Sequence, residues 1–129
     1  MDLAVDEFVR WSSPVAHIAR TLTADHELHG CPMKAGSRIV LSFGSANRDE
    51  AEFANADEVV VDRRPNRHTA FGVGPHRCVG SHLAKLVVKV ALQELLGGLG
   101  SFQIPEHGRI VCQRGETRSI TNLPVVVGP

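Results

Sequence analysis

Two stretches of the chain carry apolar residues at the spacing of an α-helix. The first, residues 2–12, begins at Asp2 as its expected N-cap and ends before Pro14, which cannot continue a helix. The second, residues 81–97, has apolar residues along one face and ends at a Gly-Gly pair. The apolar positions are Leu3, Phe8 and Trp11 in the first helix, and Leu83, Leu86, Val87, Val90, Ala91 and Leu95 in the second.

Short β-branched runs between and after these helices predict strands joined by turns. The pattern predicts strands over 15–23 and 37–43, a turn with a short strand over 25–30, a further turn over 31–36, and β pieces at 102–104, 109–111 and 124–127. Asn47 is expected to cap a short helix over 49–54, and residues 55–70 predict a loop. This mixture indicates an α+β fold in a single domain over residues 1–129.

Composition excludes several functional classes. Lys plus Arg and Asp plus Glu both count 14, so the formal net charge is zero. Proteins that bind nucleic acid or a membrane surface usually carry a basic excess, and we expect neither function. No apolar run approaches the roughly 18 residues of a membrane span. The first residues also lack the basic and apolar parts of a secretory signal, so we expect a cytoplasmic protein.

The cysteines point to one special position. Cys31, Cys78 and Cys112 form no CxxC pair, which argues against a zinc ribbon or a thioredoxin-like site and favours free thiols in a reducing compartment. Cys78 follows a glycine-rich loop and directly precedes the second helix. Backbone N–H groups, the helix dipole and the neighbouring Arg77 all favour a thiolate there, and a thiolate is a good ligand for a metal.

The segment around Cys78 allows a further comparison. Its glycines let the backbone approach a flat, bulky group. A dinucleotide loop is excluded, because Arg77 stands where the third glycine would be required. Instead the segment resembles the cysteine loop of the cytochrome P450 family, which reads Phe-x-x-Gly-x-(His/Arg)-x-Cys-x-Gly. The matching residues are Phe71, Gly74, His76, Cys78 and Gly80.

Three further blocks follow in the family's order. Glu7-x-x-Arg10 resembles the family's Glu-x-x-Arg helix, residues 45–53 resemble the segment before its meander, and residues 63–71 resemble the approach to its cysteine loop. The resemblance therefore covers essentially the whole chain and implies the C-terminal fragment of the P450 fold, with short strands between these blocks. The chain departs from the family at Glu50, where a proline is usual, at Ala56, which replaces the proline of a Pro-Asp pair, and at Val87, where a glutamate is common.

The resemblance implies a haem b site. Cys78 would be the axial iron ligand, donating electron density that favours O–O cleavage. Phe71 would lie against the haem and limit water access, and Gly80 would allow the helix to approach the porphyrin. Gly72 belongs to the same cofactor-binding loop. Arg20, His68 and His76 would contact the propionates. Separately, the resemblance implies that Glu7, Arg10 and Arg63 form a buried structural triad.

Two functions remain open at this point. The first is the haem-thiolate part of a monooxygenase that oxidises a small organic substrate with electrons from a ferredoxin or similar partner. The chain begins at the Glu-x-x-Arg helix, and the family's distal helix is absent from it, so we expect a truncated chain. The second is therefore a non-catalytic remnant, with or without haem, that self-associates through apolar surface. A zinc site using His76 and Cys78 is a third, weaker alternative.

Overall fold

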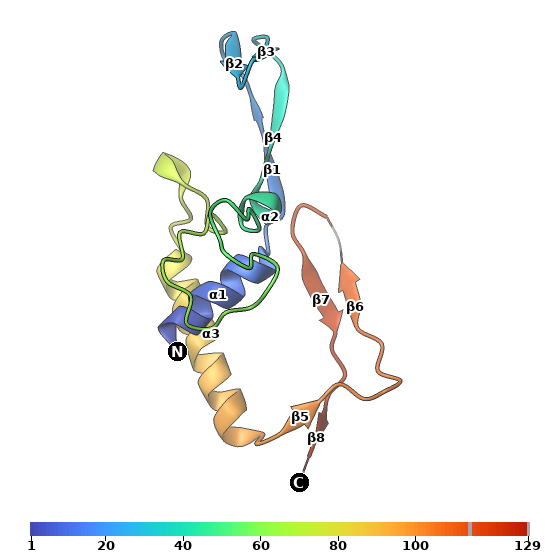
Figure 1. The fold of residues 1–129 in the computed structure, drawn as a ribbon. Coiled ribbons are helices and arrows are strands. Elements are labelled where there is room, and N and C mark those ends of the chain that lie inside the picture. Colours follow the sequence, from blue (N-terminus) through green and yellow to red (C-terminus); the bar gives the residue numbers. More distant parts are fainter. Residues whose placement is uncertain (114, 129) are drawn as a thin grey trace.

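Helix α1 (Asp2–Ser12) lies in the middle of the helical part of the fold in the computed structural model, which describes residues 1–113 and 115–128 (Figure 1). The helix ends as predicted. Ser13 adopts a left-handed conformation with φ of 38°, its N–H donates to Val9 O at 3.0 Å, and Pro14 follows. The start differs, because Met1 is the N-cap and Asp2 is already helical, without a side-chain cap.

The buried face of α1 is not the one that the apolar pattern predicts. Phe8 and Trp11 remain 38% and 40% exposed, whereas the buried residues are Val5, Glu7, Val9 and Arg10. Two charged residues occupy this face because each finds partners inside the fold, which removes the penalty for burying an unpaired charge. The hydrophobic period alone therefore points to the wrong side of this helix.

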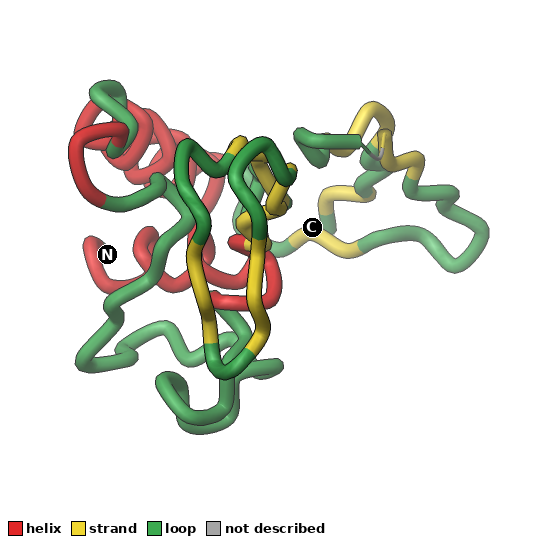
Figure 2. The backbone as a smooth tube through the Cα atoms, turned by 90° about the horizontal axis from the view of Figure 1, so that it is seen from above, coloured by secondary structure: helices red, strands yellow, loops and turns green. Residues whose placement is uncertain are grey.

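The strands form antiparallel pairs rather than one sheet. Among the described residues, β1 pairs with β4, β2 with β3, β5 with β8 and β6 with β7. Their bounds are β1 His17–Thr21, β2 His26–Leu28, β3 Cys31–Met33, β4 Arg38–Ser42, β5 Phe102–Gln103, β6 Val111–Gln113, β7 Ser119–Asn122 and β8 Val126–Val127. Seen from above, the helices and the long loop gather mainly on one side, and the C-terminal pairs lie on the other (Figure 2).

Several predicted boundaries are wrong. Residues 31–36 contain strand β3 before their turn, and strand β7 was not predicted. The short helix α2 spans Phe43–Ala46 rather than residues 49–54, and Asn47 is its C-cap instead of an N-cap. The Asn47 side chain is buried and donates to Ser13 Oγ at 2.8 Å, while its Oδ1 accepts from Thr69 N at 2.7 Å. Its tertiary partners, not local capping, decide its position.

The second predicted helix is confirmed. Helix α3 spans Ser81–Gly98 and packs beside α1, to which it is joined by ion pairs of Lys85 with Asp6 and of Lys89 with Asp2. Its large apolar side chains are mostly exposed. Leu83, Leu86, Val87 and Val90 are 46–66% exposed. The helix is therefore anchored by charged residues and leaves its hydrophobic side uncovered.

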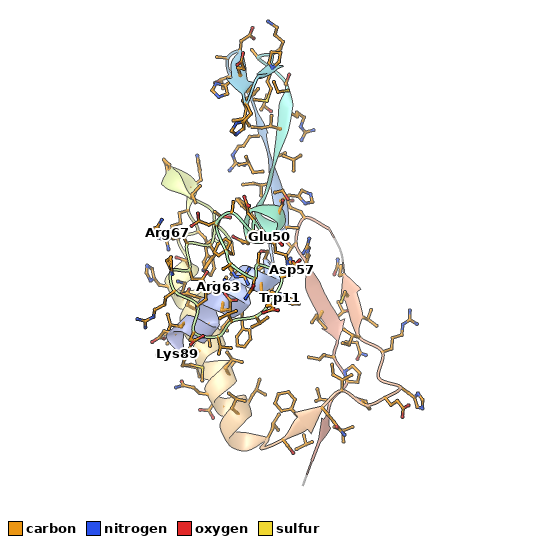
Figure 3. The ribbon with its side chains drawn as sticks, viewed as in Figure 1. Trp11, Glu50, Asp57, Arg63, Arg67 and Lys89 are labelled. Carbon is orange, nitrogen blue, oxygen red and sulfur yellow. The ribbon has the colours of Figure 1, made fainter. Side chains whose placement is uncertain are left out.

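The core is held by a carboxylate that is completely buried. Glu7 accepts two hydrogen bonds of 2.8 Å from Arg10 and one bifurcated hydrogen bond from Arg63 Nε, which lies 3.1 Å from each carboxylate oxygen. Val60 N–H donates to it at 2.8 Å and Asn66 Nδ2 at 3.1 Å. Both carboxylate oxygens are thus fully used, and the triad implied by the resemblance is present. Figure 3 places Arg63 beside α1.

The two arginines carry this cluster into the loop of residues 47–70. Arg10 donates to the carbonyls of Asn47, Ala56 and Glu58 at 2.6–2.8 Å. Arg63 donates to the carbonyls of Ala54 and Asn55 at 2.5 and 3.1 Å, and the Phe53 ring lies 5.2 and 5.9 Å from the two guanidinium carbons. A segment without regular secondary structure therefore satisfies its backbone through buried side chains.

Removal of the Glu7 carboxylate should destabilise the whole domain. Glu7→Ala leaves two buried guanidinium groups without their counter-ion, which costs on the order of 3–5 kcal/mol. Urea unfolding followed by circular dichroism would measure the free energy of unfolding. Glu50→Ala, at an exposed glutamate, is the matched control and should change it by less than about 0.5 kcal/mol. Equal stability of the two variants would contradict a structural role for the cluster.

The cluster should also set the acid limit of the fold. Burial by itself would raise the pKa of Glu7, but hydrogen bonds from Arg10, Val60 and Arg63 outweigh it and lower the pKa from 4.5 to about 2. As pH falls, Glu7 is therefore protonated in the unfolded chain before it is protonated in the folded one. The ionised carboxylate contributes about 3 kcal/mol to the free energy of unfolding. This contribution is present above pH 4.5 and is lost as pH approaches 2.

Glu7→Gln should remove this part of the pH dependence. The difference in unfolding free energy between the wild-type chain and the variant should narrow as the pH is lowered from about 5 to about 2.5, because the wild-type chain alone loses the ionised carboxylate. Urea titrations of both proteins across this pH range would measure the difference in unfolding free energy. Parallel pH profiles for the two proteins would show that Glu7 has an unshifted pKa.

Candidate functional site

The cysteine loop has the irregular backbone that its glycines predict. Gly72 and Gly74 have φ of 71° and 69°, a region that favours glycine, and the short 3₁₀ helix η1 (Gly74–His76) follows. Gly72 N–H donates to Thr69 O at 2.7 Å, and Cys78 N–H donates to Phe71 O at 2.8 Å. The loop is thus closed on itself, and Cys78 leaves it directly before α3.

The thiol of Cys78 lies on an open and apolar surface. The residue is exposed and forms no disulfide, Val79 is fully exposed, and Gly80 is the N-cap of α3. A Cβ built at Gly80 would meet only Cys78 Sγ, at 3.9 Å, so the bare backbone keeps space beside the sulfur. A thiol flanked by a valine and an unobstructed glycine fits a flat apolar group that is ligated at its centre.

The other predicted site residues divide into two groups. Phe71, Gly72 and His76 belong to the cysteine loop itself, with Phe71 half-buried and His76 exposed. Arg20 lies on β1, is exposed, and donates to Ala19 O at 2.8 Å. Figure 1 shows the β1–β4 pair and η1 extending as separate arms from the helical part. The described contacts therefore do not join Arg20 to the cysteine loop.

His68 lies beneath the loop rather than at its surface. Its side chain is only 6% exposed, and its ring packs at 5.9 Å from the Phe71 ring. Nε2 lies 3.4 Å from Asp6 Oδ1, and Ala70 N–H donates to Nδ1 at 3.3 Å. Burial lowers the pKa of His68, an effect that the Asp6 hydrogen bond partly opposes. Both ring nitrogens therefore have partners within the chain.

A basic cavity of about 430 Å³ lies next to this histidine. Residues of the loop and of both long helices line it, including Asp6, Arg67, His68, Arg77 and Lys85. Figure 3 shows Arg67 on the outer side of the long loop. The sequence did not predict the roles of Asp6 and Asn66, because Asp6 belongs to no motif and Asn66, although it lies within the block of residues 63–71, has its partner Glu7 far away in the chain. The spacing of Asp2 and Asp6 on α1, matched by Lys85 and Lys89 on α3, is the signal that predicts the helix pairing.

A larger open cleft, of about 770 Å³, lies on another side of the molecule. It lies between the end of α1, the start of β1 and the β6–β7 pair. Close to it, an isolated β-bridge joins Val15, which precedes β1, to Thr117, which precedes β7. Trp11, Pro14, Ala16 and Ile120 supply apolar lining, and Arg118 supplies charge. No sequence motif predicts the part of this lining that comes from residues 112–120, because it lies about 100 residues away from the rest of the cleft in the chain.

Two structural classes find no support in the part of the chain that the structure describes. No group of three or more His, Cys, Asp or Glu side chains gathers there in a way that would hold a metal ion. Within residues 1–113 and 115–128, no helix has both the length and the apolar character needed to cross a membrane.

Comparison with known proteins agrees with this geometry. Residues 1–110 match the family profile described as Cytochrome P450. Cytochrome P450-terp from a Pseudomonas species is 50% identical over 83% of this chain, and the steroid C26-monooxygenase of Mycolicibacterium smegmatis is 39% identical over 98% of it. The solved structure of the cytochrome P450 PksS from Bacillus subtilis superposes on 99% of the chain with a TM-score of 0.93 and 34% identity.

The chain belongs to the cytochrome P450 family, and its α+β architecture is that of the matching region of solved P450 structures. It spans 25% and 32% of the length of the two curated relatives and 34% of the solved one. The sequence-based identification of the family and of its fold class is thereby confirmed.

Proposed function

We propose that this chain is the haem-thiolate part of a cytochrome P450 monooxygenase, with Cys78 as the axial ligand of haem b. The observation that supports it most is the exposed thiol of Cys78, presented by a closed glycine loop at the start of α3. Family membership suggests the reaction class, since a relative that is 39% identical is named steroid C26-monooxygenase. When bound, the haem activates dioxygen for insertion into an organic substrate.

The chain's own residues would hold this group from one side. Gly80 keeps backbone bulk away from the sulfur, and Val79 offers an apolar contact to the porphyrin face. Phe71 would limit the access of water to the sulfur once haem is bound, and Gly72, with its positive φ, gives the loop its bend. His76 and Arg20, whose side chains are exposed, would contact the propionates, which are anionic and need cationic partners.

The basic cavity is the proposed docking area for an electron donor. Arg67, Arg77 and Lys85 line it on the same side as the cysteine loop. An acidic redox protein of the ferredoxin type would meet complementary charge there and arrive close to the thiolate. The cleft that includes Pro14, Ala16 and Ile120 is the proposed contribution of this chain to binding a small apolar substrate.

The Cys78 assignment is tested by cysteine replacement. Haem titration followed by absorbance and electron paramagnetic resonance should show thiolate-ligated ferric haem in the wild-type chain and no thiolate signature in Cys78→Ala. Cys31→Ala and Cys112→Ala are matched controls, because both cysteines are also exposed but lie on strands β3 and β6. A thiolate signature that survives in Cys78→Ala would rule out the assignment.

A second candidate function, self-association, is favoured by the uncovered apolar face of α3. Four large apolar side chains on one helix face tend to recruit a partner, and a second copy of the chain is the simplest one. Leu86→Glu places a charge in the middle of this face and should weaken association about tenfold or more. Glu94→Gln, at another exposed position of α3, should leave it unchanged.

Sedimentation velocity across a concentration series would measure this association. The wild-type chain should show a dimer or larger species that Leu86→Glu shifts toward monomer. A wild-type chain that remains monomeric at about 100 µM would contradict self-association without affecting the haem assignment.

A further inference from the structure

His68 connects three separate parts of the molecule. Its Nε2 faces Asp6 on α1, and Lys85 on α3 forms an ion pair with the same carboxylate oxygen. Its Nδ1 accepts the N–H of Ala70, which stands directly before Phe71 at the start of the cysteine loop. Both helices and the loop therefore meet at the imidazole ring of His68. This side chain is almost wholly buried.

These contacts favour one protonation state of the ring. An acceptor of the Ala70 N–H must be an unprotonated nitrogen, so Nδ1 carries no hydrogen. Asp6 presents a carboxylate oxygen to Nε2, which is satisfied when Nε2 carries the hydrogen and donates it. The neutral ring with hydrogen on Nε2 fulfils both contacts at once, whereas the other neutral tautomer and the imidazolium ion would each place an N–H against the N–H of Ala70.

We propose that His68, in this neutral form, is a positioning residue that holds the start of the cysteine loop against both long helices. The effect of His68 on the Cys78 thiolate rests on the proposed function, in which Cys78 ligates haem. The path from the ring to Cys78 is short, because Phe71 packs on His68 and Phe71 O accepts the Cys78 N–H at 2.8 Å. This role replaces the propionate contact expected for His68 from the sequence, since neither ring nitrogen is left for an outside ligand.

The charges around the ring support the neutral form. Asp6 from α1 favours the imidazolium, whereas Lys85 from α3 and Arg77 from the cysteine loop oppose it, and Arg67 lines the same cavity. Burial, the largest effect, lowers the pKa from 6.5. As pH falls, His68 is therefore protonated in the unfolded chain before it is protonated in the folded one. The stabilisation of the fold by neutral His68 is complete above pH 6.5 and is lost as pH falls through the lowered pKa of the folded state.

Two replacements separate the two contacts. His68→Asn keeps an acceptor near the position of Nδ1 and loses the reach to Asp6, whereas His68→Gln keeps a donor near Nε2 and loses the acceptor for Ala70. His82→Gln changes an exposed histidine of α3 and is the control. Amide exchange of Ala70, measured by NMR in the haem-free chain, should quicken about fivefold in His68→Gln, as expected for one lost hydrogen bond, and stay near wild type in His68→Asn.

A pH profile distinguishes positioning from mere space filling. In the wild-type chain, imidazole nitrogen shifts should report hydrogen on Nε2 near neutral pH. The protection factor of the Ala70 amide, which compares its exchange rate with that of an unstructured chain at the same pH, should fall on acidification through the same midpoint as the His68 shifts, and both uncharged variants should lack that step. Hydrogen on Nδ1 at neutral pH, or equal Ala70 exchange in the two variants, would overturn the proposal.

Haem binding then separates this proposal from the proposed function. Cys78→Ala should keep the His68 tautomer and the Ala70 protection while losing thiolate ligation. His68→Gln should keep thiolate ligation but broaden or shift its spectrum relative to His68→Asn. A chain that shows the Ala70 pattern but never forms a haem thiolate would refute only the proposed function. A haem thiolate whose spectrum is the same in wild type and His68→Gln would refute the link from His68 to Cys78.

Discussion

The buried ionic cluster of Glu7, Arg10 and Arg63 is the interaction on which the rest of this structure depends. A carboxylate with no exposed surface is tolerated only because every oxygen lone pair finds a donor. The same arginines then supply hydrogen bonds to carbonyls of the loop over residues 47–70. Few large apolar side chains are buried, so this network provides much of the order that a hydrophobic core gives elsewhere.

The cluster also determines where the cysteine loop begins. Asn66 donates to Glu7, His68 follows at the Asp6 carboxylate, and Phe71 closes the loop onto Cys78. This series begins at the fully buried Glu7 and ends at the exposed Cys78. The thiol is therefore presented by a rigid base, while its own surroundings remain open, as a ligand site for a bulky cofactor requires.

Local chemistry explains which features the sequence predicts well. Pro14 ends α1, the glycines bend the cysteine loop, and the period of α3 is regular, because each depends on residues near in the chain. The buried face of α1 and the place of α2 were predicted wrongly because distant partners decide them. Asn47, for example, is held by Ser13 and Thr69. The roles of Asp6 and His68 also depend on contacts between residues about 60 positions apart.

We propose that a fold organised around a buried glutamate presents Cys78 as a haem thiolate. The most direct test is a carbon monoxide difference spectrum of the reduced, haem-loaded wild-type chain. We expect the long-wavelength Soret band that a thiolate-ligated ferrous haem gives with carbon monoxide. A Soret band at the shorter wavelength typical of a nitrogen-ligated haem, in a chain that is folded by circular dichroism, would contradict the claim.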